Sequence, residues 1–120
     1  MFFESPALVG FSSDKDHKFH YTDNQTADDA FSALKNFLFH AAPEFENRKL
    51  YLSGESYAGK YVPDIADRIA SHNEDPNESR KINLKGILIG NGVMDFEHDS
   101  LTKSQMVFLA EKDFLSHRLA

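Results

Sequence analysis

One serine in the sequence has the neighbours that a catalytic nucleophile needs. The segment Gly54-Glu55-Ser56-Tyr57-Ala58-Gly59 follows a short apolar and aromatic run and precedes a stretch with helical spacing. A serine between a strand and a helix, with small residues two positions before and after it, is typical of a nucleophile elbow. The chain reverses there so sharply that the serine takes a strained backbone conformation, and larger neighbours would collide. Gly54 meets this requirement fully, Ala58 meets it adequately, and Gly59 gives further room.

Acyl transfer is the chemistry that such a serine supports. The Ser56 hydroxyl is expected to stand above the carboxyl end of a sheet, where ligands bind in open α/β folds. The backbone N–H of Tyr57, at the start of the next helix, can stabilise the oxyanion that forms when the hydroxyl attacks a carbonyl. A Gly-x-Ser-x-Ala pattern alone also occurs by chance, so the prediction depends on the strand before Ser56 and the helix after it.

Hydrophobic periodicity predicts the elements that position this serine. Apolar residues recur at three- and four-residue steps in two stretches, and we expect helices at about 26–41 and 57–72. Thr26 or Asp23 is the expected cap of the first helix, and Pro43 is expected to end it. Short apolar runs predict parallel strands at about 1–4, 49–53 and 83–90.

This alternation of strands and helices indicates an α/β fold, in which helices cover the faces of a parallel sheet. The chain has 120 residues and a mass of 13.6 kDa, which is enough for one small domain and too little for two. Three strands alone cannot bury both faces of a sheet or protect both of its edges. We therefore expect either that something supplements this sheet or that the chain is a piece of a larger domain.

The composition excludes several classes of protein. Nineteen acidic side chains against thirteen basic ones give a net charge of −6, which argues against a partner held by nucleic-acid phosphates. No run of about 18 apolar residues occurs, so no membrane span is expected. The chain has no Cys, which excludes a disulfide scaffold, an iron–sulfur cluster and a thiolate zinc site. We expect neither a metal nor a cofactor.

The segment around Ser56, followed by Tyr61-Val62-Pro63, resembles the nucleophile motif of the serine carboxypeptidases. Further stretches match that family in the same order and span Phe2 to about Asp95. They are Glu4-Ser5-Pro6-Ala7, Val9-Gly10-Phe11-Ser12, Thr26-Ala27-Asp28, Pro43-Glu44-Phe45, Ile82-Asn83-Leu84-Lys85-Gly86 and Ile89-Gly90-Asn91-Gly92. The resemblance implies an α/β-hydrolase fold, with residues 1–120 as its central, nucleophile-bearing segment.

The resemblance also implies an activity, which is removal of C-terminal residues from peptides or proteins that have a free C-terminus. Ser56 would form the acyl-enzyme, and the Tyr57 backbone N–H would be one oxyanion donor. Glu55 matches the family glutamate that, with a second glutamate elsewhere, holds the substrate's terminal carboxylate. Two close carboxyl groups can share a proton and so hydrogen-bond a carboxylate, and a rise in pH would weaken this binding. Taken without the family, Glu55 is better interpreted as a solvated acid at the start of a helix.

The sequence departs from the family pattern at Leu8, where Gly is usual, and at Lys60, where His is common. The family's triad acid and histidine come late in the fold, and its Gly-rich oxyanion loop comes before residue 2. We therefore expect these groups outside the chain, which would make it a fragment without activity on its own. Four residues that could look like substitutes are better interpreted as surface or structural groups: Asp95, His98, Asp99 and His117. An acyltransferase that uses the same nucleophile remains an alternative.

Two N-glycosylation sequons, Asn24-Gln25-Thr26 and Asn77-Glu78-Ser79, lie in stretches that are expected to be loops. They add mild support for a secretory route. The resemblance implies a vacuolar, lysosomal or extracellular location, although the first six residues do not read as a signal peptide.

Overall fold

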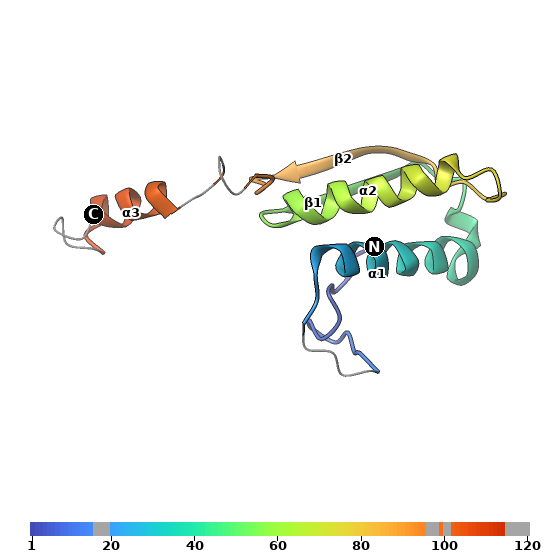
Figure 1. Cartoon of the computed structure of the whole chain (residues 1–120), viewed down its shortest axis with the longest axis horizontal. Coiled ribbons are helices and arrows are strands. Elements are labelled where there is room, and N and C mark those ends of the chain that lie inside the picture. Colours follow the sequence, from blue (N-terminus) through green and yellow to red (C-terminus); the bar gives the residue numbers. More distant parts are fainter. Residues whose placement is uncertain (16–19, 96–98, 100–101, 115–120) are drawn as a thin grey trace.

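A βαβ unit forms the centre of the structure, a computed structural model that describes residues 1–15, 20–95, 99 and 102–114. Strands β1 (Leu50–Glu55) and β2 (Leu84–Gly90) pair in parallel. Helix α2 (Ala58–Glu74) connects them and lies along the sheet, as Figure 1 shows. The predicted strands at 49–53 and 83–90 and the predicted helix at 57–72 are confirmed. Because the strands are parallel, their carboxyl ends meet at one edge, where Glu55 is the register partner of Gly90.

Helix α1 (Asp23–Asn36) begins three residues before the predicted start, because its cap differs from the expected ones. Thr22 is the N-cap, and its hydroxyl accepts a hydrogen bond from the Gln25 backbone N–H at 3.3 Å. The Gln25 side chain accepts one in return from the Thr22 N–H at 3.1 Å, which completes a capping box. Thr26 and Asp23 are therefore both inside the helix, and the prediction that one of them is the cap was wrong.

The helical run after α1 ends where Pro43 was predicted to end it. It continues as a π-helical turn, η1 (Phe37–Ala41), and stops at Ala42, whose backbone leaves the helical region at φ −144° and ψ 64°. A proline disfavours the helical conformation in the residue before it, which explains the stop. A short 3-10 turn, η2 (Pro43–Phe45), then leads toward β1.

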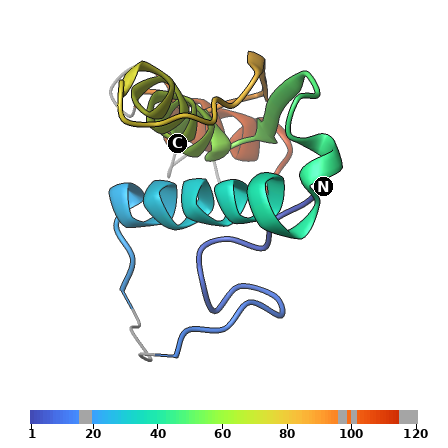
Figure 2. The same cartoon turned by 90° about the vertical axis from the view of Figure 1, so that its right-hand side faces the viewer.

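The core lies between α1 and α2 and extends to the covered face of the sheet, and Figure 2 shows the two helices side by side. Its buried residues are Leu34, Leu38, Phe39, Ile69 and Ile82. Leu50 and Leu52 of β1 pack against this cluster, since alternate residues of the strand point toward the helices. The opposite face of the sheet is exposed, with Tyr51 at 55% and Leu88 at 56%. This agrees with the expectation that so small a sheet cannot bury both of its faces.

The predicted strand at 1–4 is not formed, and within the described ranges β1 and β2 are the two strands of the sheet. Residues 1–15 run past α1 as a loop (Figure 2). The polar groups of Glu4 are used inside this loop: its carboxylate accepts the Phe11 N–H at 2.6 Å, and its carbonyl accepts the Ser12 hydroxyl at 2.5 Å. A strand needs a neighbour for its ladder, and the apolar composition of 1–4 does not supply one.

Helix α3 (Thr102–Glu111) makes no contact with another helix or strand among the residues that the structure describes, and Figure 1 shows it at the far end of the molecule. None of the helices in those ranges is both long and apolar enough to cross a membrane.

Leu8 adopts a left-handed backbone conformation, with φ 73°, in the turn that Glu4 closes. Its N–H donates to the Ser12 carbonyl at 3.2 Å, so the turn is held from both sides. This is the position where the family usually has Gly. A side chain at positive φ costs about 1–2 kcal/mol, because its Cβ crowds the backbone. Leu8 therefore stores strain in this turn.

We predict that Leu8→Gly stabilises the protein by about 1 kcal/mol, because relief of the backbone strain exceeds the extra flexibility that Gly gives the unfolded chain. The free energy of unfolding in urea measures the change. Leu8→Ala is the matched control, since it removes the side chain and keeps the Cβ. Equal stability of the Gly and Ala variants would contradict the explanation.

Candidate functional site

Ser56 lies at the reversal between β1 and α2, at the carboxyl edge of the sheet. Its φ is 61°, a left-handed conformation in which an L-residue is strained. Its N–H donates to the Gly90 carbonyl at 3.0 Å, so the ladder of the parallel strands extends one residue past β1. The residue is exposed, and a strained, exposed serine at a strand end has the geometry of a nucleophile elbow.

Hydrogen bonds to its carbonyl oxygen hold the peptide between Ser56 and Tyr57 in place. The Ser56 carbonyl accepts the N–H of Gly59 at 3.0 Å and the N–H of Val93 at 2.9 Å. In a trans peptide the N–H points opposite to the carbonyl. These two bonds therefore also set the direction of the Tyr57 N–H, which is the predicted oxyanion donor. Val93 is not among the residues that the sequence predicted for the site. The only sequence signal for it is the Gly90-Asn91-Gly92 turn, in which Asn91 has a φ of 45°.

Small residues allow the chain segments around Ser56 to approach this closely. A Cβ on Gly54 would overlap the Cβ of Ala58, which faces it from the first turn of α2. A Cβ on Gly59 would lie 2.6 Å from the Val93 carbonyl oxygen and 2.8 Å from the Val93 nitrogen. Gly59 thus admits the Val93 backbone, whose N–H binds the Ser56 carbonyl. The physical requirement for small residues at these positions comes from backbone and Cβ atoms, which cannot turn aside.

The Tyr57 side chain reaches the start of α1. Its hydroxyl donates to the two carboxylate oxygens of Asp23 at 3.1 and 3.2 Å, and its ring packs edge-on against Tyr61 with centroids 4.9 Å apart. Partial burial and then the hydrogen bond to Asp23 raise the pKa of the Tyr57 phenol above its ordinary value. Burial and the charge of Asp23 raise the pKa of Tyr61 in the same direction. Both phenols therefore keep their protons at neutral pH.

Glu55 is exposed at the last position of β1, beside its register partner Gly90. No second carboxylate within the described part of the chain hydrogen-bonds to it. The structure therefore places Glu55 next to Ser56 at the same edge, and its predicted role with a second glutamate stays a prediction. Lys60, the other departure from the family pattern, pairs with Asp64 at 3.2 Å one turn further along α2.

The described histidines do not contact Ser56. His72 is buried near the far end of α2, about 20 Å away along the helix axis, and its Nε2 bonds the Arg80 carbonyl at 2.8 Å. Asp99 accepts the N–H groups of Met94 and Asp95 at 2.9 Å each, so its side chain binds the backbone of the segment that follows β2. This contact agrees with a structural role for Asp99. His98 and His117 lie outside the described residues.

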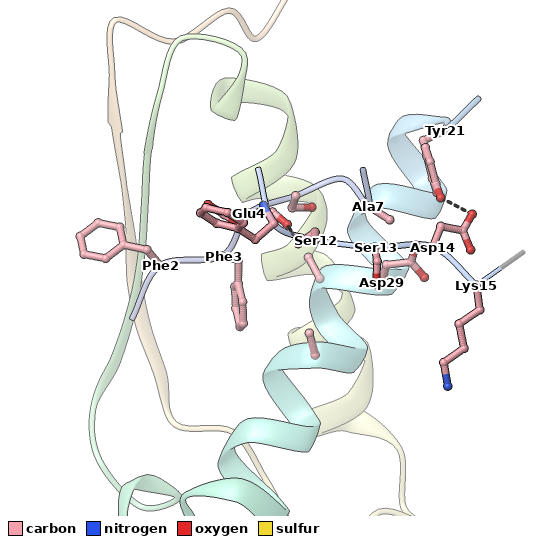
Figure 3. A pocket seen from close by; sticks show the side chains of 14 residues that line it. Phe2, Phe3, Glu4, Ala7, Ser12, Ser13, Asp14, Lys15, Tyr21 and Asp29 are labelled. Atoms are coloured by element: carbon pink, nitrogen blue, oxygen red, sulfur yellow. Dashed lines mark hydrogen bonds between the residues drawn. The ribbon is translucent and has the colours of Figure 1, made fainter. Parts of the chain in front are cut away.

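A pocket of about 920 Å³ lies away from Ser56, between the loop 1–15 and α1. Figure 3 shows Phe2 and Phe3 at one end and the hydrogen bond between Tyr21 and Asp14 at the other. Ser56 does not line this pocket. Ser56 instead lies at the carboxyl edge of the sheet, directly after β1.

The two sequons are both at the surface, but only one is in a loop. Asn77 is exposed in the turn after α2, where its side-chain amide donates to Asp75 at 3.0 Å. Asn24 is exposed in the first turn of α1, and its side-chain oxygen accepts from Arg68 at 3.3 Å. The loop prediction for Asn24 was wrong, because the capping box starts the helix at residue 23. Glycosylation of either residue stays a prediction.

Comparison with known proteins gives a consistent result. A family model described as "Serine carboxypeptidase" matches residues 1–119. The chain is 42% identical over 102 residues to serine carboxypeptidase-like 26 of Oryza sativa subsp. japonica, which covers 83% of this chain and 21% of that protein. It is 37% identical over 119 residues to the lysosomal protective protein of Mus musculus, which covers 99% of this chain and 23% of that protein. The chain thus spans about a fifth of the length of these relatives.

A solved structure is also similar to this one. It is the crystal structure of Kex1(delta)p, a prohormone-processing carboxypeptidase from Saccharomyces cerevisiae, with a TM-score of 0.65 and 34% identity. The match covers 95% of this chain and 25% of that chain. The resemblance therefore holds in the backbone as well as in the sequence.

We predict that Gly54→Ala destabilises the protein by about 1–3 kcal/mol, because the new Cβ meets the Ala58 Cβ and forces β1 and α2 apart. Urea unfolding measures the loss. Ala58→Gly introduced together with Gly54→Ala should restore most of it, since the clash needs both methyl groups. A double variant as unstable as Gly54→Ala alone would show that the clash is not the cause.

We predict that Asn24 and Asn77 each carry an N-linked glycan when the protein is made in a secretory host, because both side chains are exposed. Treatment with an endoglycosidase should lower the mass, and Asn24→Gln and Asn77→Gln should each remove one glycan. A mass that is unchanged by the enzyme would contradict the prediction for both sites.

Proposed function

The chain belongs to the serine carboxypeptidase family, and on this basis we propose that Ser56 is the nucleophile of a serine-type carboxypeptidase. The fold is that of an α/β-hydrolase, as in the carboxypeptidase of known structure. We place residues 1–120 in the central, nucleophile-bearing part of such a domain. The observation that carries the proposal is the exposed, left-handed Ser56 between β1 and α2.

The proposed reaction is acyl transfer in two steps. The Ser56 Oγ attacks the carbonyl carbon of the C-terminal peptide bond, and a general base takes the hydroxyl proton. The C–N bond then breaks, the proton goes to the leaving amine, and a C-terminal amino acid leaves. Water hydrolyses the resulting ester on Ser56. A histidine is the expected base, and within the described ranges none contacts Ser56.

Two neighbours of Ser56 have proposed roles. The Tyr57 N–H stabilises the oxyanion, and the bonds from Gly59 and Val93 to the Ser56 carbonyl support this role because they fix the peptide between Ser56 and Tyr57. Glu55 helps to hold the substrate's terminal carboxylate through a proton shared with a second glutamate.

The substrates that we propose are peptides and proteins with a free C-terminus. The name of the yeast structure describes that protein as a prohormone-processing carboxypeptidase, and the mouse relative is named a lysosomal protective protein. These names support a peptide substrate and a secretory route to a vacuole, a lysosome or the cell exterior. The net charge of −6 argues against a nucleic-acid partner.

One observation favours a second candidate function, in which these 120 residues have no catalytic activity by themselves. No described histidine contacts Ser56, and a serine without a base is a weak nucleophile. Stoichiometric labelling of Ser56 by a fluorophosphonate in this chain alone would contradict inactivity. An acyltransferase would use the same serine, and comparison of the products from peptide and acyl-glucose donors separates it from a peptidase.

We predict that Ser56→Ala lowers kcat for release of a C-terminal amino acid at least about 10⁴-fold in the protein that contains this chain, with peptide binding largely retained. The loss follows because no acyl-enzyme can form. Ser53→Ala is the matched control, since Ser53 is also exposed and lies on β1 three residues earlier. Retained peptidase activity in Ser56→Ala would refute the assignment.

A further inference from the structure

A hydrogen bond joins the residue after the predicted nucleophile to the first residue of a different helix. The Tyr57 hydroxyl donates to Asp23 at 3.1 and 3.2 Å, across 34 residues of sequence. Tyr57 is the N-cap of α2, and Asp23 begins α1. We infer that Asp23 is a positioning residue, which holds the Ser56–Tyr57 peptide in place through the Tyr57 side chain. This inference rests on the proposed function for its catalytic consequence and on the contacts alone for its mechanical part.

The Tyr57 ring can act on the peptide because both are attached to the same Cα. The peptide plane turns about the ψ of Ser56 and the φ of Tyr57, and turning it changes the direction of the Tyr57 N–H. Gly59 and Val93 hold the plane at the Ser56 carbonyl. Asp23 holds the far end of the ring, so rotation at the Tyr57 Cα strains the bond to Asp23. The two restraints act on opposite sides of the Tyr57 backbone nitrogen.

Asp23 is itself held relative to α2. The capping box of Thr22 and Gln25 fixes the first turn of α1. Arg68 of α2 binds the carboxylate of Asp28 at 3.0 Å, one turn along α1 from Asp23. The contacts between α1 and α2 therefore fix the distance from Asp23 to the N-cap of α2.

The Tyr57 hydroxyl is a hydrogen-bond donor at neutral pH. The pKa of the Tyr57 phenol is raised by its partial burial and by Asp23, so the hydroxyl keeps its proton and stays a donor. The Tyr61 ring, packed at 4.9 Å, limits the motion of the Tyr57 ring. Asp23 contacts the Tyr57 hydroxyl and not the Ser56 hydroxyl, so it acts through Tyr57 and is not a catalytic residue.

The experiment compares five variants of the protein: Asp23→Ala, Asp23→Asn, Tyr57→Phe, the double variant Asp23→Ala with Tyr57→Phe, and Asn73→Ala. The first measurement is the ¹⁵N order parameter of the backbone N–H at position 57, which does not require activity. The second is the rate at which a fluorophosphonate labels Ser56.

Loss of the hydrogen bond between Asp23 and Tyr57 should loosen the Ser56–Tyr57 peptide and slow the acylation of Ser56. In Asp23→Ala and Tyr57→Phe, the order parameter should fall from the rigid range near about 0.85 toward about 0.6. Labelling of Ser56 should slow about tenfold in each, as for loss of one hydrogen bond to a charged group. The double variant should be no slower than either single one, because both changes remove the same bond. Asp23→Asn keeps an acceptor oxygen and should restore most of the order parameter and of the labelling rate.

Asn73→Ala is the matched control for a purely structural effect. It removes the two hydrogen bonds between the Asn73 side chain and the Ile82 backbone near the far end of α2, which costs about 1–3 kcal/mol of stability, and it leaves the bond between Asp23 and Tyr57 in place. Its order parameter and labelling rate should equal those of the wild type well below the unfolding temperature.

Each outcome tests either the positioning role of Asp23 or the proposed function of Ser56. An unchanged order parameter in Asp23→Ala overturns the positioning role, whatever the labelling rate. The same slowing in Asn73→Ala as in Asp23→Ala overturns it as well, because a general loss of stability would then be the cause. A wild-type protein that is not labelled at Ser56, with an order parameter that still falls in Asp23→Ala, leaves the positioning role supported and refutes the proposed function.

Discussion

The close approach of α2 and the turn after β2 to the end of β1 is the constraint on which the site depends. Gly54 admits Ala58, and Gly59 admits the Val93 backbone, whose N–H reaches the Ser56 carbonyl at 2.9 Å. With larger side chains the segments would stand further apart, and the Ser56–Tyr57 peptide would lose one of its two restraints. The left-handed conformation of Ser56 costs free energy, and it persists because the surrounding contacts leave the chain no relaxed alternative.

Local patterns in the sequence predicted α2, β1 and β2 to within a few residues, because helical spacing and short apolar runs record burial directly. The strand at 1–4 failed for a physical reason. A strand is a relation between two segments, and Phe2 and Phe3 show only that the segment is apolar. The start of α1 was misplaced because Thr22 and Gln25 cap it together, whereas the prediction considered single residues.

Some residues of the candidate site could likewise be predicted from the sequence, and others could not. Ser56 and its small neighbours form a pattern that is contiguous in the sequence, so the sequence could indicate them. Val93 and Asp23 reach the site from 37 positions after and 33 positions before Ser56, through a backbone bond and a phenol hydroxyl. The Gly90-Asn91-Gly92 turn is a weak signal for Val93, and Asp23 has none, because contacts of this kind depend on how α1, α2 and β2 pack. The sequence therefore indicated Ser56 as the candidate nucleophile, and the structure was needed to find the contacts around it.

The parallel pairing of β1 and β2 also dictates an order of events during synthesis. Leu84 pairs with Leu50, so β1 has no ladder partner until about thirty further residues have left the ribosome, which takes several seconds at typical rates of translation. During that interval the open backbone of β1 and its apolar side chains are available to other strands. A nascent chain of this design therefore benefits from early formation of α2, which can shield one face of β1 before β2 exists.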